Sequence, residues 1–385
     1  MMENYTLIAP CFFGLEKIVA REIQALDFEI IKTEDGRVAF KTGPDGIAKA
    51  NMWLRTAERV LWQVAEFEAY TFEELFQGVK AISWQKYLPY GVYFPISKVS
   101  SVRSELFSKR DIQAITKKAI VEKMKMQYGG DEYGMIREDE EVMPIFVFIH
   151  KNKVTISIDT SGLALHKRGY REIATAAPIR ETLAAAMISL TPWRPGRPLV
   201  DPMCGSGTIL IEAVMKGRNM APGINREFLS EDWRIIDKDI WRQTRKEAYE
   251  QINDLDFKVY GSDIDPEAVA IAKENADIAG VADYIDFTVA DMVTFTSKEE
   301  YGFIITNPPY GERLEDEVSV ERLYADMGRM YKKLPTWSLY AITSYEDFEF
   351  CFKRKAERKR KIYNGMLRSD YYQYPGPRPP KPVQK

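Results

Sequence analysis

The run Asn307-Pro308-Pro309-Tyr310 has the residue types to hold a planar amine. Two adjacent prolines stiffen the chain and remove two backbone donors, so the carbonyl oxygens of the run stay free to accept hydrogen bonds. Asn307 adds a side-chain carbonyl acceptor, and Tyr310 adds an aromatic face on which a base can stack. The alternative is a rigid turn, because Pro-Pro pairs and Asn are common in turns. The run alone does not decide between an amino-methylation site and such a turn.

A glycine-containing loop lies about a hundred residues upstream, at 201–208. It stands between a short predicted strand, 198–200, and an apolar helical start, 209–214, which is the order of a nucleotide-type site in a doubly wound sheet. Gly205 and Gly207 let the backbone approach a ligand closely, and the unpaired N–H groups of a helix start favour a carboxylate. A phosphate-binding loop is disfavoured because no Gly-Lys-Ser/Thr follows, and the spacing of a dinucleotide-binding loop is incomplete.

Carboxylates end two further predicted strands. Residues 258–265 form a predicted strand with Asp263 and Asp265 at its end. An acid at this position can accept both hydroxyls of a ribose, and Asp263 is the first choice. Asp265 could equally be the N-cap of the following helix. Asp291 ends the next predicted strand, where it could accept from an adenine amine or belong to a surface turn.

The second half of the chain has the elements needed to place these loops at one edge of a sheet. Residues 303–306 form a buried parallel strand directly before Asn307, and ligands bind at the carboxyl ends of such strands. A helix over 319–333, a strand over 338–344 and a helix over 345–356 follow. Asn364-Gly365 then predicts a tight antiparallel hairpin between 360–363 and 366–374.

Taken together, the four loops resemble those of the class I S-adenosylmethionine-dependent methyltransferases. The resemblance implies an α/β, Rossmann-like domain with a mixed seven-stranded sheet, in which the glycine loop binds the methionine part of the cofactor. The cofactor-binding residues that it implies are Asp201, Pro202, Cys204, Gly205, Ser206, Gly207, Thr208, Asp263, Ile264, Asp291, Met292 and Asn307. The Asn-Pro-Pro-Tyr form is similar to the branch that methylates exocyclic amines of nucleobases. It assigns catalysis to Asn307, Pro308, Pro309 and Tyr310.

The first half of the chain predicts an α+β layout. Strands are expected at 5–9, 28–32, 37–41, 92–99, 142–150 and 153–159, and helices at 14–26, 46–56, 71–81 and 110–128. This layout resembles a ferredoxin-like segment followed by a THUMP domain, an RNA-binding module. The segments 166–171 and 177–184 resemble the link found in THUMP-containing guanine-N2 RNA methyltransferases. Lys167, Arg168 and Arg171 are expected either to contact RNA or to have a structural role at this link.

The resemblance sets the expected domains and activity. The domains are a ferredoxin-like segment at 1–65, a THUMP domain at 66–162, a methyltransferase domain at 163–375 and a disordered tail at 376–385. The expected reaction is methylation of the N2 amine of a guanine in structured RNA, with 23S ribosomal RNA as the first candidate. Alternatives are a transfer RNA guanine-N2 methyltransferase, a DNA adenine-N6 methyltransferase and a noncatalytic RNA-binding factor.

Composition narrows the class of protein. The 385 residues have a net charge of −3, which argues against nonspecific coating of nucleic acid and leaves basic runs such as 353–361 as local patches or solvated faces. Three cysteines and two histidines predict a reduced, cytoplasmic protein without a metal site. Cys204 is expected to be a buried filler. A predicted helical insertion at 217–254, with Trp233 and Trp241, has no role assigned from sequence.

Overall fold

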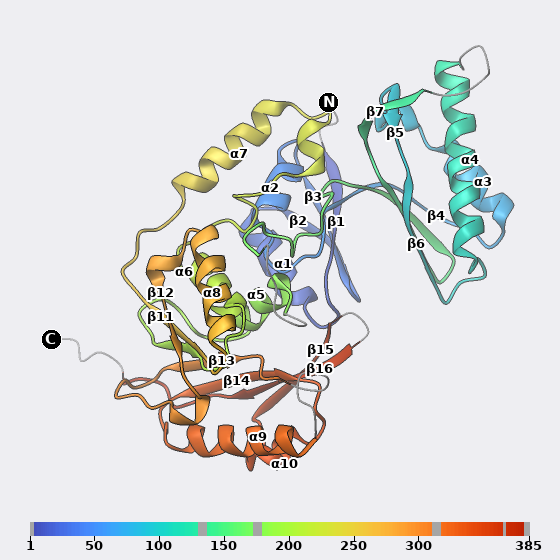
Figure 1. Cartoon of the computed structure of the whole chain (residues 1–385). Helices are drawn as coiled ribbons and strands as arrows, with labels where there is room; N and C mark the ends of the chain where they lie inside the picture. Colours follow the sequence, from blue (N-terminus) through green and yellow to red (C-terminus); the bar gives the residue numbers. More distant parts are fainter. Residues whose placement is uncertain (1–3, 130–136, 172–178, 310–316, 365–366, 381–385) are drawn as a thin grey trace. The chain divides into compact units, whose positions relative to one another are not determined.

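The computed structural model describes residues 4–129, 137–171, 179–309, 317–364 and 367–380 (Figure 1). The chain forms two compact units, and each unit combines separate segments of the chain. The first contains Met1–Cys11, Ala20–Leu165 and Glu227–Glu247, and the second contains Phe12–Val19, His166–Arg226 and Ala248–Lys385. Among the helices of the described ranges, none has both the length and the apolar character needed to cross a membrane.

The first unit is built on a seven-stranded sheet with the strand order β2-β3-β1-β4-β9-β8-β6. Neighbouring strands are antiparallel except for β6 and β8, which are parallel. The strands are β1 (Tyr5–Pro10), β2 (Glu29–Glu34), β3 (Arg37–Thr42), β4 (Leu61–Glu68), β6 (Ile96–Val102), β8 (Ile145–His150) and β9 (Lys153–Asp159). The helices along this half of the chain are α1 (Glu16–Ala25), α2 (Gly46–Trp53), α3 (Phe72–Ala81) and α4 (Lys109–Tyr128).

Two features of this sheet differ from the sequence prediction. The single strand expected at 92–99 is two strands, β5 (Gly91–Tyr93) and β6, which separate at Pro95 because proline cannot donate to a strand ladder. β5 pairs instead with β7 (Glu138–Val142), which was not predicted. β4 was also not predicted. A bulge between Gln63 and Ala65 interrupts the alternation of inward and outward side chains by which a strand is identified in a sequence.

Part of the insertion that the sequence left without a role belongs to the first unit. The predicted helix is confirmed as α7 (Lys238–Glu250), coloured yellow in Figure 1. The Trp233 indole N–H donates to the Val142 carbonyl oxygen at 2.9 Å, and the Ser230 hydroxyl donates to the Thr160 carbonyl oxygen at 2.8 Å. Because Trp233 is fully buried, these contacts make the 227–247 segment a packing element of the first unit.

The second unit contains the mixed seven-stranded sheet that the sequence predicts, with the order β12-β11-β10-β13-β14-β16-β15. The first five strands in that order are parallel, and β16 is antiparallel to both its neighbours. The strands are β10 (Leu199–Asp201), β11 (Val259–Asp263), β12 (Ile285–Val289), β13 (Phe303–Thr306), β14 (Ser338–Thr343), β15 (Arg358–Asn364) and β16 (Leu367–Tyr374). The terminal antiparallel hairpin is confirmed, while the Gly365 turn position lies outside the described residues.

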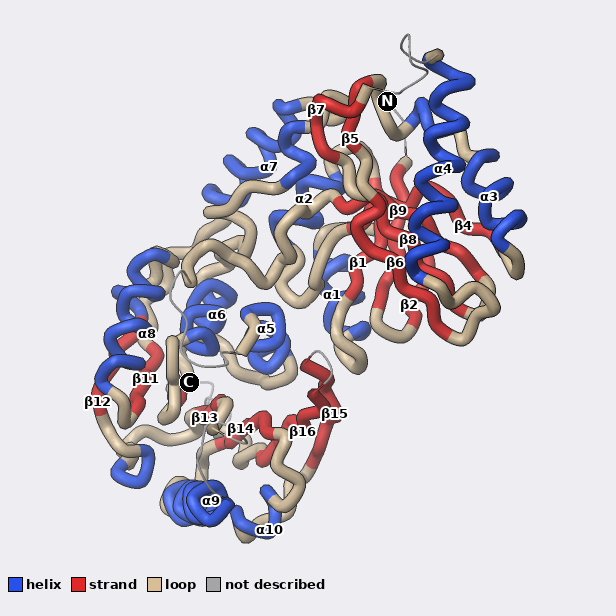
Figure 2. Tube along the Cα trace, turned by 45° about the vertical axis from the view of Figure 1, so that its right-hand side comes forward, coloured by secondary structure: helices blue, strands red, loops and turns tan. Residues whose placement is uncertain are grey.

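Helices cover both faces of this second sheet. Figure 1 and Figure 2 show α5 (Glu181–Ser189), α6 (Thr208–Gly217) and α8 (Pro266–Ile278) on one face, and α9 (Glu317–Lys332) and α10 (Phe348–Phe352) on the other. Such two-sided burial agrees with the burial of every residue of the central strands β10, β13 and β14, which are largely apolar. The helix predicted over 345–356 is reduced to α10, whose C-cap, Lys353, has the left-handed conformation (φ 60°).

Candidate active site

Four loops with polar residues leave the second sheet at the carboxyl edge of its parallel strands. β10 and β13 are adjacent, with Leu199 opposite Phe303 and Val200 opposite Ile304. The glycine loop follows β10 and Asn307 follows β13 directly, so both leave the sheet at the same edge. β11 and β12 extend the edge on the side of β10 away from β13. This edge is where an open α/β sheet binds ligands.

The glycine loop adopts a backbone that side chains rarely allow. Gly205 and Gly207 have φ values of 51° and 77°, in the left-handed region that favours glycine. A Cβ at Gly207 would also lie 3.0 Å from the Phe287 ring and 3.1 Å from Ala272. Gly207 is the N-cap of α6 and has no side chain with which to cap it. The N–H groups that open α6 therefore form a site for an anionic group.

Asp263 connects the second strand end to the glycine loop. Its Oδ2 accepts from the Gly205 N–H at 2.8 Å, and its Oδ1 accepts from the Asp265 N–H at 3.1 Å. A carboxylate has about four acceptor positions, so capacity remains for hydroxyl donors. Asp265 is the N-cap of α8 and accepts from the Glu267 N–H at 2.9 Å. Of the two roles considered for Asp265, the structure shows the capping role.

Asp201 is a buried carboxyl group at the end of β10. Its Oδ1 accepts from the Met203 N–H at 3.2 Å. Burial raises the pKa of Asp201 to about 7, and the charge of Asp263 contributes in the same direction. A buried carboxyl group of this kind is stabilised in its ionised form when a cation is placed beside it.

Two further residues of the glycine loop pack inside the second unit. Cys204 and Ser206 are buried, and burial raises the pKa of the Cys204 thiol. Cys204 therefore lacks the thiolate character of a nucleophile, consistent with the filler role expected of it. The Asn275 side-chain amide, from α8, donates to the Ser206 carbonyl oxygen at 3.0 Å. Asn275 was not singled out in the sequence, because its partner lies 69 positions away.

Ile264 and Asp291 lie at the ends of β11 and β12 on the side where an adenine is expected. Ile264 is 69% exposed directly beyond Asp263, whereas Met292 is buried. The Asp291 Oδ1 accepts from the Val293 N–H at 3.0 Å and caps a short helical turn. Asp291 thus has the turn role, and its second carboxylate oxygen is a further acceptor.

Side chains from two neighbouring elements fix the backbone of the Asn307 loop. The Tyr324 hydroxyl, on α9, donates to the Pro309 carbonyl oxygen at 3.3 Å. It also lies 2.8 Å from the Thr343 hydroxyl at the end of β14, which accepts from the Tyr345 N–H at 3.1 Å. Tyr324 is fully buried. Neither Tyr324 nor Thr343 carries a sequence motif. The expected stacking residue Tyr310 lies outside the described residues.

The basic residues expected at the link differ in exposure. The Arg168 side chain is 2% exposed and pairs with Glu212 at 3.3 Å. Arg171 pairs with Glu181 at 3.2 Å and donates to the Ile179 carbonyl oxygen at 2.7 Å. Both guanidinium groups are therefore committed inside the second unit, which favours the structural role over the RNA contact. Lys167, by contrast, is exposed.

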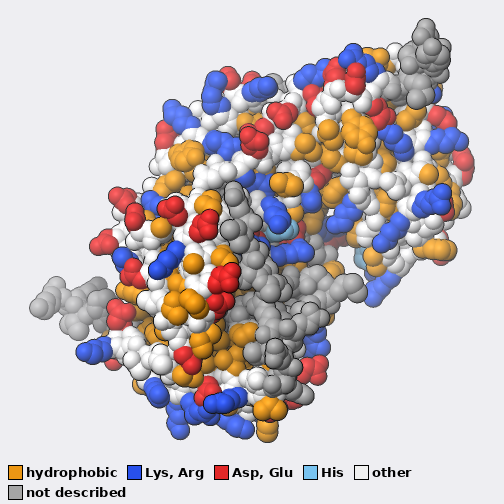
Figure 3. Space-filling model, viewed as in Figure 1, with side chains coloured by type: hydrophobic (Ala, Val, Ile, Leu, Met, Phe, Trp, Pro, Cys, Tyr) orange, Lys and Arg blue, Asp and Glu red, His pale blue; other side chains and the backbone are white. Residues whose placement is uncertain are grey.

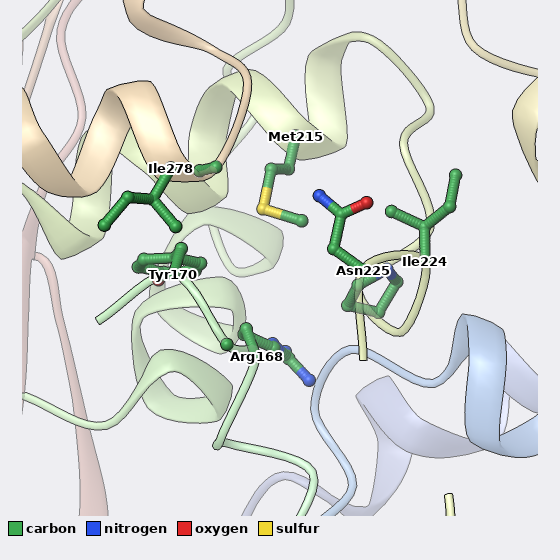
Figure 4. Close-up of a pocket in the computed structure, with 9 residues that line it drawn as sticks. Arg168, Tyr170, Met215, Ile224, Asn225 and Ile278 are labelled. Atoms are coloured by element: carbon green, nitrogen blue, oxygen red, sulfur yellow. The ribbon is translucent and has the colours of Figure 1, made fainter. Parts of the chain in front are cut away.

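Arg168 also lines a cavity of about 200 Å³. Figure 4 shows it between Arg168, Tyr170 and the side chains of Met215 and Ile278. Met215 and Ile278 are in the last turns of α6 and α8, whereas the glycine loop is at the start of α6. The cavity therefore lies toward the opposite edge of the sheet and is not the expected cofactor site.

Known families match three successive parts of the chain. Residues 168–373 match the RMKL-like methyltransferase domain, 6–61 the RlmL ferredoxin-like domain and 69–159 the THUMP domain. The chain belongs to the RMKL-like methyltransferase family. This membership confirms the resemblance drawn from the sequence and the predicted fold class, an α/β methyltransferase domain preceded by ferredoxin-like and THUMP domains.

Individual relatives match almost the whole chain. The Bacillus subtilis (strain 168) protein named "Putative RNA methyltransferase YpsC" is 48% identical over 374 residues, which are 97% of this chain and 96% of the relative. The crystal structure of SMU.472, named "a putative methyltransferase complexed with SAH", is 43% identical with a TM-score of 0.91 and covers 99% of this chain and 100% of that chain. A "predicted N6-adenine-specific DNA methylase" from Listeria monocytogenes str. 4b F2365 is 47% identical with a TM-score of 0.92, covering 98% and 97%.

Proposed function

We propose that this protein is an S-adenosylmethionine-dependent RNA methyltransferase that methylates the N2 amine of a guanine, with 23S ribosomal RNA as its substrate. The methyltransferase family, the THUMP match and the name of the Bacillus subtilis relative support RNA as the substrate class. The SMU.472 complex with SAH supports S-adenosylmethionine as the methyl donor. Guanine N2 rests on the resemblance of the link segment to guanine-N2 enzymes. The choice of 23S ribosomal RNA rests on the similarity of the whole chain to the first half of the bacterial 23S ribosomal RNA guanine-N2 methyltransferase.

The residues at the carboxyl edge suit this cofactor. The N–H groups that open α6 would hold its carboxylate, and the buried Asp201 carboxyl group would face its cationic groups. Asp263 would accept from the ribose hydroxyls. Ile264 would offer an apolar contact to the adenine, and Asp291 an acceptor for its amine. When bound, this cofactor supplies a methyl group on a positively charged sulfur, so the protein needs no activated nucleophile of its own.

The Asn307 loop supplies the acceptors for the guanine amine. Because the Pro309 carbonyl oxygen already accepts from Tyr324, we assign the two amine hydrogens to the Asn307 side-chain oxygen and the Pro308 carbonyl oxygen. Accepting both hydrogens holds the amine in one orientation, and such orientation can supply several kcal/mol of a reaction barrier. A guanine in a stack must first be extruded, at a cost of a few kcal/mol. We propose Tyr310 as the ring on which it stacks.

One observation carries this proposal. The loop with the acceptors and the loop with the glycines leave adjacent parallel strands, β13 and β10, at the same edge. A rigid Pro-Pro turn without a ligand would need neither this neighbour nor the Tyr324 contact.

Methyl transfer to defined nucleic acids tests the proposal. The protein would be incubated with S-adenosylmethionine labelled in the methyl group and, separately, with ribosomal RNA, transfer RNA and duplex DNA. We expect label in ribosomal RNA and N2-methylguanine in its nucleoside digest. Label in duplex DNA as N6-methyladenine would instead support the reading suggested by the name of the Listeria relative. No transfer to any of the three would contradict an enzymatic role on these substrates.

A further inference from the structure

The hairpin of β15 and β16 projects beyond the carboxyl edge that carries the Asn307 loop. Thr343, the last residue of β14, is opposite Asp370 of β16, which is opposite Lys361 of β15. Tyr363 and Arg368 form a pair two residues farther along the hairpin, about 7 Å past this level at roughly 3.4 Å per residue. Thr343 contacts Tyr324, which holds the Asn307 loop through Pro309. The hairpin therefore extends past the site at which the amine would be held.

Several residues of this projection share one face. Side chains alternate between faces along a strand, and residues directly opposite on neighbouring strands lie on the same face. Lys361, Tyr363 and Arg368 meet both conditions. Asp370 does so too, and its carboxylate lies 3.6 Å from the Arg368 guanidinium. Lys361 and Tyr363 are exposed, and 48% of the Arg368 side chain is exposed. The Tyr363 ring packs against Phe13 in a T-shaped arrangement, with 6.3 Å between the ring centroids, so the ring is held in place while it stays exposed.

We infer that the face formed by Lys361, Tyr363 and Arg368, the hairpin face, binds the unpaired RNA strand beside the target nucleotide. This inference rests on the proposed function. Two cations on either side of an aromatic ring can bind successive phosphates while the ring stacks on a base. A strand that enters the site for base extrusion would have such unstacked bases next to the extruded one.

Basic residues on this hairpin could also have either of two roles that involve no RNA. On an edge strand they prevent pairing with another sheet, and β15 is the edge of its sheet (Figure 2). Charged runs are also often only solvated faces, and Figure 3 shows acidic and basic side chains interspersed over most of the face in view. Both roles tolerate replacement of Lys361 and Arg368 by glutamine, which is polar and solvated. An RNA contact does not, because glutamine cannot neutralise a phosphate.

The matched control lies at the opposite edge of the same sheet. Lys332 and Lys333 are exposed at the end of α9, which precedes the first residue of β14. The double variant Lys332→Gln/Lys333→Gln therefore removes the same charge as Lys361→Gln/Arg368→Gln, far from the carboxyl edge. A third variant, Tyr363→Ala, removes the ring without changing the charge.

The experiment measures two quantities for each variant: the KM for protein-free total RNA from cells lacking the gene, and the salt dependence of binding to a short unpaired RNA. For Lys361→Gln/Arg368→Gln we expect KM to rise about tenfold and the slope of log K against log salt to fall by about 1.4, at roughly 0.7 per phosphate contact. Tyr363→Ala should raise KM about fivefold or more through lost stacking, with the slope unchanged. The control pair should match the wild type.

Wild-type methyl transfer to RNA is measured first, which separates this inference from the proposed function. No transfer to RNA would overturn the proposed function and the hairpin inference with it. Normal wild-type activity, with KM and slope also unchanged in both hairpin variants, would overturn the hairpin inference alone. An equal rise of KM in the control pair would also overturn it, because the effect would then come from net charge.

Discussion

The affinity of this protein for S-adenosylmethionine should depend on pH through one carboxyl group, that of Asp201. Burial raises the pKa of Asp201 to about 7. The cofactor carries a sulfonium and an ammonium group, so it should bind the ionised carboxylate in preference to the neutral acid. Binding should therefore tighten as the pH rises through 7. Asp201→Asn removes the titrating group but keeps an oxygen that can accept from Met203.

The expected magnitude follows from the raised pKa. If only the ionised form binds, the dissociation constant scales as one plus the ratio of neutral to ionised carboxyl, so it should be about 25-fold larger at pH 5.5 than at pH 7.5. The contribution of Asp201 to folding stability should change with pH in the opposite direction to cofactor affinity. A carboxyl whose pKa is higher in the folded protein contributes most to stability at low pH, and this contribution is lost as the pH rises from 3.8 through about 7. The loss is at most about 4 kcal/mol, at roughly 1.4 kcal/mol per pKa unit.

Isothermal titration calorimetry from pH 5.5 to 7.5, below the pKa of the amino group of the cofactor, in buffers of different ionisation enthalpy, would measure both affinity and proton release. The wild type should release close to one proton per cofactor at pH 6, and Asp201→Asn should release less and show a flat pH dependence. Thermal unfolding of the unliganded proteins over the same range should show a weaker folding trend in Asp201→Asn than in the wild type, because burial also raises the pKa of Glu22 and Glu181, which both proteins keep. The same pH dependence in the two proteins, or none in the wild type, would refute the reasoning.

Three further substitutions divide the site by function. Asn307→Ala should lower turnover about 100-fold with little change in cofactor affinity, by analogy with the loss of one positioned hydrogen-bonding group in other enzymes. Equal losses of turnover and cofactor affinity, in single-turnover and titration assays, would remove Asn307 from the amine site. Asp263→Ala should weaken cofactor binding about tenfold or more, because it removes an ionised acceptor, and an unchanged dissociation constant would exclude it from the ribose site. Tyr324→Phe should slow methyl transfer about tenfold at unchanged cofactor affinity, through a looser Asn307 loop. Its control is Tyr331→Phe on the same helix, because the buried Tyr331 hydroxyl donates to the Trp337 carbonyl oxygen at 2.9 Å. This control should lose about 1 kcal/mol of stability and keep its transfer rate. Equal slowing of methyl transfer in the two variants would assign the Tyr324 effect to stability.

The parallel strands of the second unit could be predicted because each combines a local signal with a functional loop. β13 is a buried four-residue run with three apolar residues that lies directly before Asn307, and β10 ends at the glycine loop. β11 ends at Asp263 before a proline-initiated helix. Burial on both faces requires apolar strands, and ligand binding at the carboxyl edge requires polar loops. Both requirements act on residues that are adjacent in sequence.

What the sequence did not predict depends on partners that are distant along the chain. Tyr324 and Thr343 look like ordinary helix and strand residues, but the fold brings Tyr324 to Pro309 and Thr343 to Tyr324. From sequence, Arg168 resembles a basic surface residue. In the structure it is paired with Glu212, which is 44 positions away along the chain. Trp233 likewise finds Val142 only in the folded unit. No periodicity or spacing rule contains such side-chain pairings, so sequence patterns identified the loops of the site and not the residues that hold them.

The central claim is that the loop 201–208 holds the methyl donor beside Asn307. A crystal structure of this protein with S-adenosylhomocysteine and a guanine-containing oligonucleotide tests it most directly. We predict that the homocysteine carboxylate lies at the start of α6, that Asp263 accepts from the ribose, and that Asn307 and the Pro308 carbonyl oxygen accept from the guanine N2. A cofactor bound elsewhere, or a guanine whose amine faces away from Asn307, would contradict the account.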